Sequence, residues 1–126
     1  MILLDTCALL WLAHDQERMS DETLRQINET PLLYVSAITA FEIGVKHRAG
    51  KLQLPVSPRL WLESILSHHD VSVIDLDRNI CLRATELPPI HRDPCDRFIV
   101  ATALIKACPI VTADKRFTAY GVATLI

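Results

Sequence analysis

The amino-acid sequence predicts a three-layer α/β/α protein with a central, mostly parallel β-sheet. Continuous apolar runs alternate along the chain with segments whose apolar residues repeat at helical spacing. Such runs are typical of strands buried on both faces, and their alternation with helices favours a parallel sheet covered on both sides. The 126 residues are 50% hydrophobic and contain no Gly- or Ser-rich linker, so we expect one domain over residues 1–126.

The first third of the chain predicts two strands and two helices. Residues 1–5 form an apolar run that ends on an acid, as a buried strand would. A short helix is expected over residues 6–13. A second helix begins at Ser20, which is a good N-cap, and ends before Pro31. The next apolar run, residues 32–35, predicts the second strand.

The middle of the chain predicts two more helices and a third strand. Ser36 is the expected N-cap of a helix that ends at Gly50. Its apolar residues repeat at helical spacing and are expected to form its buried face; they are Ile38, Phe41, Val45 and Ala49. After a loop with prolines, a helix is expected over residues 58–69 and a strand over residues 71–75.

The last third predicts two helices and two strands. Asp77 is expected to open a helix that runs to about Leu87, where Pro88 and Pro89 stop it. Asp93-Pro94 indicates the start of another helix, which runs to about residue 107, since proline at the first helical position loses no needed N–H. Residues 109–112 and 122–125 predict the remaining strands, with a helical turn between them.

Acidic side chains are predicted to gather at one edge of this sheet. In open α/β sheets, ligands bind beyond the carboxyl ends of the strands. Asp5 ends the first strand, Asp114 follows the strand at 109–112, and Asp96 lies in the first turn of its helix. Glu42 lies mid-helix and borders the apolar face, where a carboxylate is costly unless a cation or a donor meets it.

Converging carboxylates repel one another, and a hard divalent cation is the usual remedy. Mg²⁺ takes oxygen ligands and commonly only one or two direct carboxylates. Such an ion can activate water and stabilise in-line displacement at a phosphodiester, so the acids suggest metal-assisted phosphoester hydrolysis. Helix capping is the alternative for Asp5, Asp93, Asp96 and Asp114, but it does not explain Glu42.

The charge balance and the cysteines exclude some classes of protein. Thirteen Lys and Arg against fifteen Asp and Glu give a net charge of -2, which excludes a uniformly basic nucleic-acid binder. The charge is uneven: residues 1–45 hold two basic and seven acidic side chains, and residues 46–126 hold eleven and eight. The four cysteines show no CxxC pair, and no signal or membrane segment is evident, so we expect a cytoplasmic protein with reduced thiols and no membrane partner.

Four ordered blocks of sequence resemble the PIN-domain family, and most closely its VapC-type toxins of type II toxin–antitoxin systems. They are MILLDTCALLW at residues 1–11, VSAITAFEIGVKHRAGKL at 35–52, HRDPCDRFIVA at 91–101 and VTAD at 111–114. The resemblance implies a PIN-like fold and a Mg²⁺-dependent endoribonuclease that hydrolyses RNA phosphodiester bonds with metal-activated water.

The resemblance also implies roles for individual residues. Mg²⁺ or Mn²⁺ would be held in a pocket of four acids, with Asp5 and Asp96 as the most direct ligands and Glu42 and Asp114 completing the charge or acting through water. Two further residues are implied to support the site, namely Asp93 and Thr112. Cys7 and Cys95 depart from the family pattern, and we expect both to be packing residues.

Basic residues near the acids could hold RNA phosphates. The candidates are Lys46, Arg48, Arg92 and Arg97. A solvated surface role is the alternative for each, and Arg97 could instead pair with a site carboxylate. His91 is a possible general base, but metal-bound water needs none.

Partners and alternative functions follow from the same residues. The resemblance implies a cognate antitoxin that binds a hydrophobic groove, and a homodimer. The apolar segment 9–12 could be core or could be covered by another chain.

A receiver-like phosphoacceptor domain is one alternative function, although Leu4 stands where its paired acids require a carboxylate. A catalytically silent PIN-like binding module is the other.

Overall fold

One parallel β-sheet forms the centre of the protein. The computed structural model describes residues 1–126. Five strands lie in the order β3-β2-β1-β4-β5, and every neighbouring pair is parallel. They are β1 (Ile2–Leu4), β2 (Leu33–Ser36), β3 (Val71–Ile74), β4 (Ile110–Val111) and β5 (Thr124–Leu125). The predicted parallel sheet is confirmed, and most strands are one or two residues shorter than expected.

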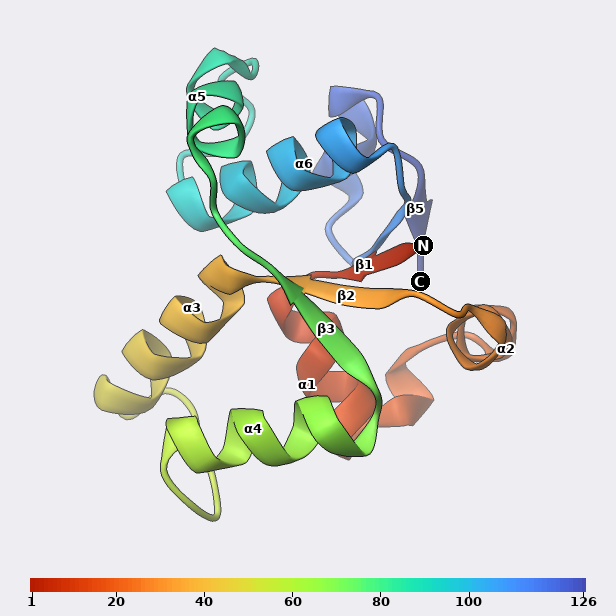
Figure 1. The fold of residues 1–126 in the computed structure, drawn as a ribbon, viewed down its shortest axis with the longest axis vertical. Helices are drawn as coiled ribbons and strands as arrows, with labels where there is room; N and C mark the ends of the chain where they lie inside the picture. Colours follow the sequence, from red (N-terminus) through yellow and green to blue (C-terminus); the bar gives the residue numbers. More distant parts are fainter.

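Helices cover both faces of this sheet. The α-helices are α1 (Thr6–His14), α2 (Asp21–Glu29), α3 (Ala37–Arg48), α4 (Pro58–His68), α5 (Arg78–Glu86) and α6 (Pro94–Lys106). Two 3-10 helices complete the chain, η1 (Gln16–Arg18) and η2 (Lys115–Tyr120). Figure 1 shows α5 and α6 on one side of the sheet and α1 and α4 on the other, which confirms the three-layer α/β/α architecture.

Side-chain caps fix where the helices begin. A side-chain oxygen accepts a backbone N–H at the start of each α-helix and of η2; the capping residues are Asp5, Ser20, Ser36, Ser57, Asp77, Asp93 and Asp114. A cap satisfies one of the free N–H groups of the first turn. Capping, the alternative role considered for Asp5, Asp93 and Asp114, is therefore observed, and only one carboxylate oxygen of each takes part in it.

The core is divided between the two faces. Alternate residues of β1 point in opposite directions: Leu3 belongs to a cluster with α5, α6 and η2, whereas Ile2 and Leu4 belong to a cluster with α1, α2 and α4. The apolar segment of α1 contributes to the second cluster, with Leu9 and Leu12 buried. No helix of the protein has the length and hydrophobicity that a bilayer span requires.

The prediction for the buried face of α3 is wrong at three of its four residues: only Ile38 is buried. Phe41 is 61% exposed and Val45 is 48% exposed, while Ile43 is fully buried. Apolar residues occur all round this helix, so their spacing does not single out one face. The polar Thr39 is buried because its hydroxyl is hydrogen-bonded to the hydroxyl of Thr6, at 3.0 Å.

Truncations on the two faces of α3 test this corrected orientation. Ile43→Val removes one buried methylene, and we expect it to lower the free energy of unfolding by about 1 kcal/mol. Val45→Ala removes more atoms from an exposed position and is expected to change stability by less than about 0.5 kcal/mol. Urea unfolding of both variants measures the difference, and a larger loss at Val45 would contradict this packing.

Candidate active site

An acidic pocket of about 270 Å³ lies beyond the carboxyl ends of β1 and β4. Figure 1 shows α3 and α6 starting at this same edge, on opposite faces of the sheet. The lining residues are Asp5, Thr6, Cys7, Trp11, Glu42, Lys46, Asp93, Asp96, Ala113 and Asp114. The fold thus brings together the four acids that the sequence singled out, although 109 positions separate the first from the last.

Asp5 is the most buried of these acids. It follows β1 directly, is 8% exposed, and its Oδ1 accepts the Ala8 amide at 2.8 Å. Burial raises the pKa of Asp5, and the charges of Glu42 and Asp114 act in the same direction. Hydrogen bonding by Thr112 and the Ala8 amide opposes this rise. A bound cation would relieve the cost of charge at this position.

Asp96 is the acid with no hydrogen-bond partner in the protein. It is half-buried in the first turn of α6. Burial raises the pKa of Asp96 to about 6, and the neighbouring Asp93 adds to the rise, while His91 opposes it. A partly desolvated carboxylate without a donor is well suited to bind a cation.

Glu42 lies on α3, so it reaches the pocket from the face of the sheet opposite to α6. Its Oε1 accepts the Thr6 hydroxyl at 2.6 Å, and its Oε2 lies 4.0 Å from Nζ of Lys46. The donor that a carboxylate at this position requires is therefore Thr6, whose hydroxyl also contacts Thr39. This chain of polar side chains joins α1 to α3.

Asp114 lies in the loop after β4 and is held from two sides. Its Oδ2 lies 2.8 Å from Nε2 of His91 and 2.7 Å from Nη2 of Arg116, and its Oδ1 lies 3.0 Å from Nε of Arg116. The guanidinium of Arg116 and the contact with His91 hold the pKa of Asp114 well below its usual range. Asp114 is therefore the acid that stays ionised most readily.

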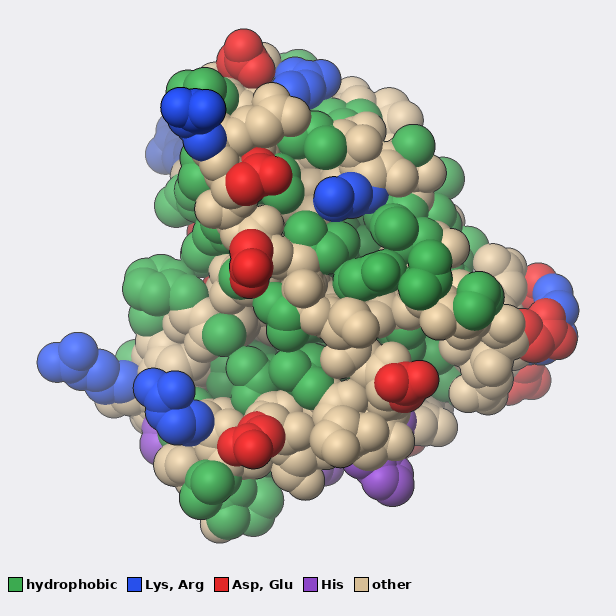
Figure 2. Space-filling model, in the orientation of Figure 1, with side chains coloured by type: hydrophobic (Ala, Val, Ile, Leu, Met, Phe, Trp, Pro, Cys, Tyr) green, Lys and Arg blue, Asp and Glu red, His purple; other side chains and the backbone are tan.

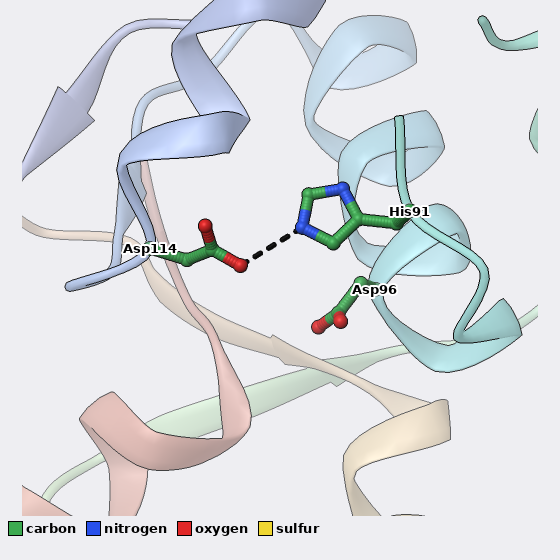
Figure 3. Close-up of side chains that lie close together, drawn as sticks. All are labelled: His91, Asp96 and Asp114. Atoms are coloured by element: carbon green, nitrogen blue, oxygen red, sulfur yellow. Dashed lines mark hydrogen bonds and ion pairs between the residues drawn. The ribbon is translucent and has the colours of Figure 1, made fainter. Parts of the chain in front are cut away.

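His91 and Arg116 belong to this site, and the sequence did not predict their contacts. One side-chain N or O atom from each of His91, Asp96 and Asp114 lies within 4.8 Å of the other two. Figure 3 shows these three side chains close together. In that view the two carboxylates point toward the same space, one from the start of α6 and one from the loop after β4. Only the folded arrangement of α6 and η2 brings His91 to Asp114.

Asp93 and Thr112 lie where the sequence placed them. The Oδ1 atom of Asp93 accepts the amide of Cys95 at 2.9 Å, and Asp93 also lines the pocket. Thr112 is buried, and its hydroxyl oxygen accepts the Asp114 amide at 3.0 Å. Each is thus in a position to orient an acid of the pocket.

Arg97 does not face the pocket, and its expected role is corrected. Its guanidinium donates hydrogen bonds to four backbone carbonyls, those of Ala84, Leu87, Pro88 and His91. These carbonyls lie at the end of α5 and in the loop that leads to α6. Arg97 therefore fastens this loop and is not available to RNA or to a site carboxylate. The other basic candidates differ: Lys46 lines the pocket, and Arg48 and Arg92 are exposed.

The two cysteines near the pocket differ in burial. Cys95 is buried, as expected for a packing residue, and burial raises its pKa to about 12. Cys7 is exposed and lines the pocket, so its expected packing role is wrong. Partial desolvation of its thiol by the surrounding pocket and the neighbouring charge of Asp5 raise the pKa of Cys7. Neither thiol is therefore activated as a nucleophile.

The fold and the pocket together define a three-layer α/β protein whose acidic site is suited to a divalent cation. The sequence matches the PIN domain family over residues 2–123. The chain belongs to this family, which confirms the resemblance found in the sequence.

Known relatives agree with this assignment. The chain is 28% identical over 120 residues to Ribonuclease VapC22 of Mycobacterium tuberculosis (strain ATCC 25618 / H37Rv), covering 94% of this chain and 91% of that protein. The structure of VapBC2 from Rickettsia felis bound to a DNA fragment from their promoter is similar in fold, with a TM-score of 0.71, 16% identity, and coverage of 98% of this chain and 97% of that one. A toxin–antitoxin complex from Klebsiella pneumoniae gives a TM-score of 0.66 at 18% identity, with coverage of 100% and 97%.

The metal-free protein is expected to lose stability as pH rises from about 5 to 7. The pKa of the Asp96 carboxyl is about 6 in the folded protein and 3.8 in the unfolded chain. The folded form therefore binds more protons than the unfolded form in this range, and its stability falls as these protons are lost. We expect a loss of about 1 kcal/mol, after allowance for the partial exposure of Asp96. Urea unfolding in EDTA measures it.

The matched control for this pH dependence is Asp96→Asn, which should lose most of the difference between pH 5 and pH 7. Mg²⁺ at about 100 times its dissociation constant should add roughly 2.7 kcal/mol to the wild type at pH 7. An equal pH dependence in wild type and variant would contradict the origin assigned to it.

Proposed function

We propose that this protein is the ribonuclease toxin of a type II toxin–antitoxin system and hydrolyses RNA phosphodiester bonds with Mg²⁺ or Mn²⁺ held in the acidic pocket. The observation that carries the proposal is the convergence of four carboxylates from separate elements, with Asp96 lacking any protein partner. Membership of the PIN domain family and similarity to a protein named a ribonuclease support it.

The donor set suits a hard cation, and each acid has a distinct part in holding it. Asp5 and Asp96 would be the direct ligands, because Asp5 is the most buried acid, where a charge most needs a cation, and Asp96 has no donor in the protein. Glu42 and Asp114 would act through water. Thr6 already donates a hydrogen bond to Glu42, and His91 and Arg116 already contact Asp114. When bound, the metal supplies an activated water and neutralises charge on the phosphate.

The remaining side chains of the site orient these acids. Thr112 restrains the loop that carries Asp114, and Asp93 fixes the first turn of α6, on which Asp96 lies. Lys46 is 39% exposed beside Glu42 and can meet a phosphate that enters the pocket. We propose that Arg48 and Arg92, both exposed, contact the RNA backbone further from the reacting bond.

An antitoxin and a second copy of the chain are the proposed protein partners. A groove of about 490 Å³ is lined by Ala40 of α3 and by Pro58, Arg59, Leu62, Glu63 and Leu66 of α4. Phe41 and Leu60, which follow the lining residues Ala40 and Arg59 along the chain, are exposed apolar side chains. Figure 2 shows hydrophobic side chains reaching the surface near α3 and along the edge strand β3. The solved relatives described as VapBC2 and as a toxin–antitoxin complex support the antitoxin as a partner.

A cleavage assay with metal removal tests the enzymatic proposal. The purified protein is incubated with a mixture of cellular RNAs in EDTA, and then with Mg²⁺ or Mn²⁺ restored. Cleavage that requires the added metal is the expected result. Failure to cleave under every metal condition would favour the catalytically silent binding module. Formation of an acid-labile aspartyl-phosphate with a small phosphodonor would favour the receiver-like alternative.

A further inference from the structure

We propose that His91 is a positioning residue of the metal pocket: Tyr120 holds its ring, and its Nε2–H fixes the carboxylate of Asp114. The proposal rests on the proposed function for its effect on metal binding. The hydrogen bonds that it assigns to Tyr120, His91 and Asp114 lie within this chain and do not depend on metal or RNA. No role as ligand or general base is assigned to the imidazole.

The imidazole of His91 is enclosed on all sides. Its side chain is 1% exposed. The ring of Phe117 meets it edge-on with the centroids 5.0 Å apart, and the ring of Tyr120 is stacked on it at 5.5 Å. A buried ring held between two aromatic rings has little rotational freedom, so the direction of Nε2 is fixed before any ligand arrives.

The hydrogen-bond partners of the His91 ring indicate a hydrogen on Nε2. The Tyr120 hydroxyl accepts the backbone N–H of His91 at 2.9 Å and lies 2.6 Å from Nδ1. Tyr120 thus fixes the Nδ1 side of the ring and leaves Nε2 directed at Asp114. Nε2 faces the ionised carboxylate of Asp114, which can only accept, so Nε2 must carry a hydrogen. A nitrogen that carries a hydrogen has no lone pair for a metal.

The two partners of Asp114 differ in how firmly they are held. Four donors occupy its oxygens, namely Nε2 of His91 and the backbone N, Nε and Nη2 of Arg116. The side chain of Arg116 is 61% exposed, so it can leave when RNA or solvent competes for it. The buried imidazole cannot leave without opening the core. His91 is thus the permanent support of Asp114.

Substitutions at His91 separate positioning from packing. Leucine fills the space without a donor, whereas glutamine places an amide N–H near the position of Nε2. We expect His91→Leu to weaken Mn²⁺ binding by about 10- to 100-fold, and His91→Gln to recover most of that loss. Binding is measured by electron paramagnetic resonance of free Mn²⁺, and circular dichroism verifies the fold. Equal affinity of the Leu and Gln variants would overturn the proposal.

Tyr120→Phe keeps the ring and removes only the hydroxyl, so it decides the case in which His91→Leu does not fold. We expect Tyr120→Phe to lose several-fold in Mn²⁺ affinity. Tyr34→Phe alters the only other tyrosine and is the control, whose affinity should not change. An affinity equal to that of the control would overturn the role of Tyr120.

Nitrogen-detected NMR of the metal-free protein reads the hydrogen on His91 directly and requires neither metal nor RNA. Hydrogen on Nε2 is expected, and a bare Nε2 would overturn the proposal even if the enzyme cleaves RNA. If the wild type binds no Mn²⁺ and cleaves nothing, the proposed function fails together with the metal-binding role of His91. If it cleaves RNA normally and His91→Leu binds Mn²⁺ normally, only the present proposal fails.

Discussion

Asp5→Asn is expected to lower RNA cleavage by about 10³-fold or more and to abolish growth inhibition. The substitution replaces one carboxylate oxygen of the most buried acid by an amide, which cannot neutralise a cation. Metal-assisted stabilisation of a phosphodiester transition state contributes several kcal/mol, and each 1.4 kcal/mol corresponds to a factor of ten in rate. Single-turnover cleavage with excess enzyme measures the loss.

The fold should survive this substitution. The Oδ1 atom of Asp5 caps α1 through the Ala8 amide, and asparagine is an equally good N-cap. Removing a charge whose pKa is raised by burial also removes a cost to folding. Asp21→Asn, in the exposed first turn of α2, is a matched control that keeps full activity. Full activity of Asp5→Asn would exclude Asp5 as a metal ligand.

Arg97→Ala is expected to lower the free energy of unfolding by about 2–4 kcal/mol. The guanidinium donates to four backbone carbonyls between the end of α5 and His91, and alanine leaves them without these donors. The loop that carries His91 should loosen as well, so the affinity for Mn²⁺ should also fall. Urea unfolding and Mn²⁺ titration measure the two effects.

Arg92→Ala is the control for Arg97→Ala and should behave in the opposite way. Arg92 is exposed, so its loss should leave stability within about 0.5 kcal/mol of the wild type. RNA affinity should fall, and its dependence on salt concentration should become weaker. If Arg97→Ala were as stable as the wild type but weaker in RNA binding, a phosphate contact would be the better assignment.

Much of the fold follows from local sequence signals. Continuous apolar runs located the five strands, and Ser20, Ser36, Asp77 and Asp93 marked helix starts that the structure confirms. These signals are local because a cap acts within one turn and a buried strand is apolar along its length. The convergence of Asp5, Asp96 and Asp114 followed from topology, since the carboxyl ends of parallel strands share one edge, whereas the place of Glu42 among them followed from the resemblance to the family.

Contacts between distant segments could not be predicted in this way. The orientation of α3 depends on the Thr6–Thr39 hydrogen bond, which joins residues 33 positions apart. Arg97 satisfies carbonyls of a loop whose path no periodicity describes. His91 reaches Asp114 only because Tyr120 and Phe117 enclose its ring. Each of these contacts depends on how separate elements pack, which spacing along the chain does not encode.

The order of strands has a consequence for synthesis of the protein. β4 lies beside β1 near the middle of the sheet, yet it comes after nearly all the other elements along the chain. A growing polypeptide can form β1, β2 and β3 early, but the sheet remains open on the β4 side until Ile110 and Val111 pair with Leu3 and Leu4. Asp114 follows immediately after that pairing. The four acids of the pocket therefore cannot come together until β4 has paired with β1, so a nascent chain that lacks residues 110–114 has no complete pocket.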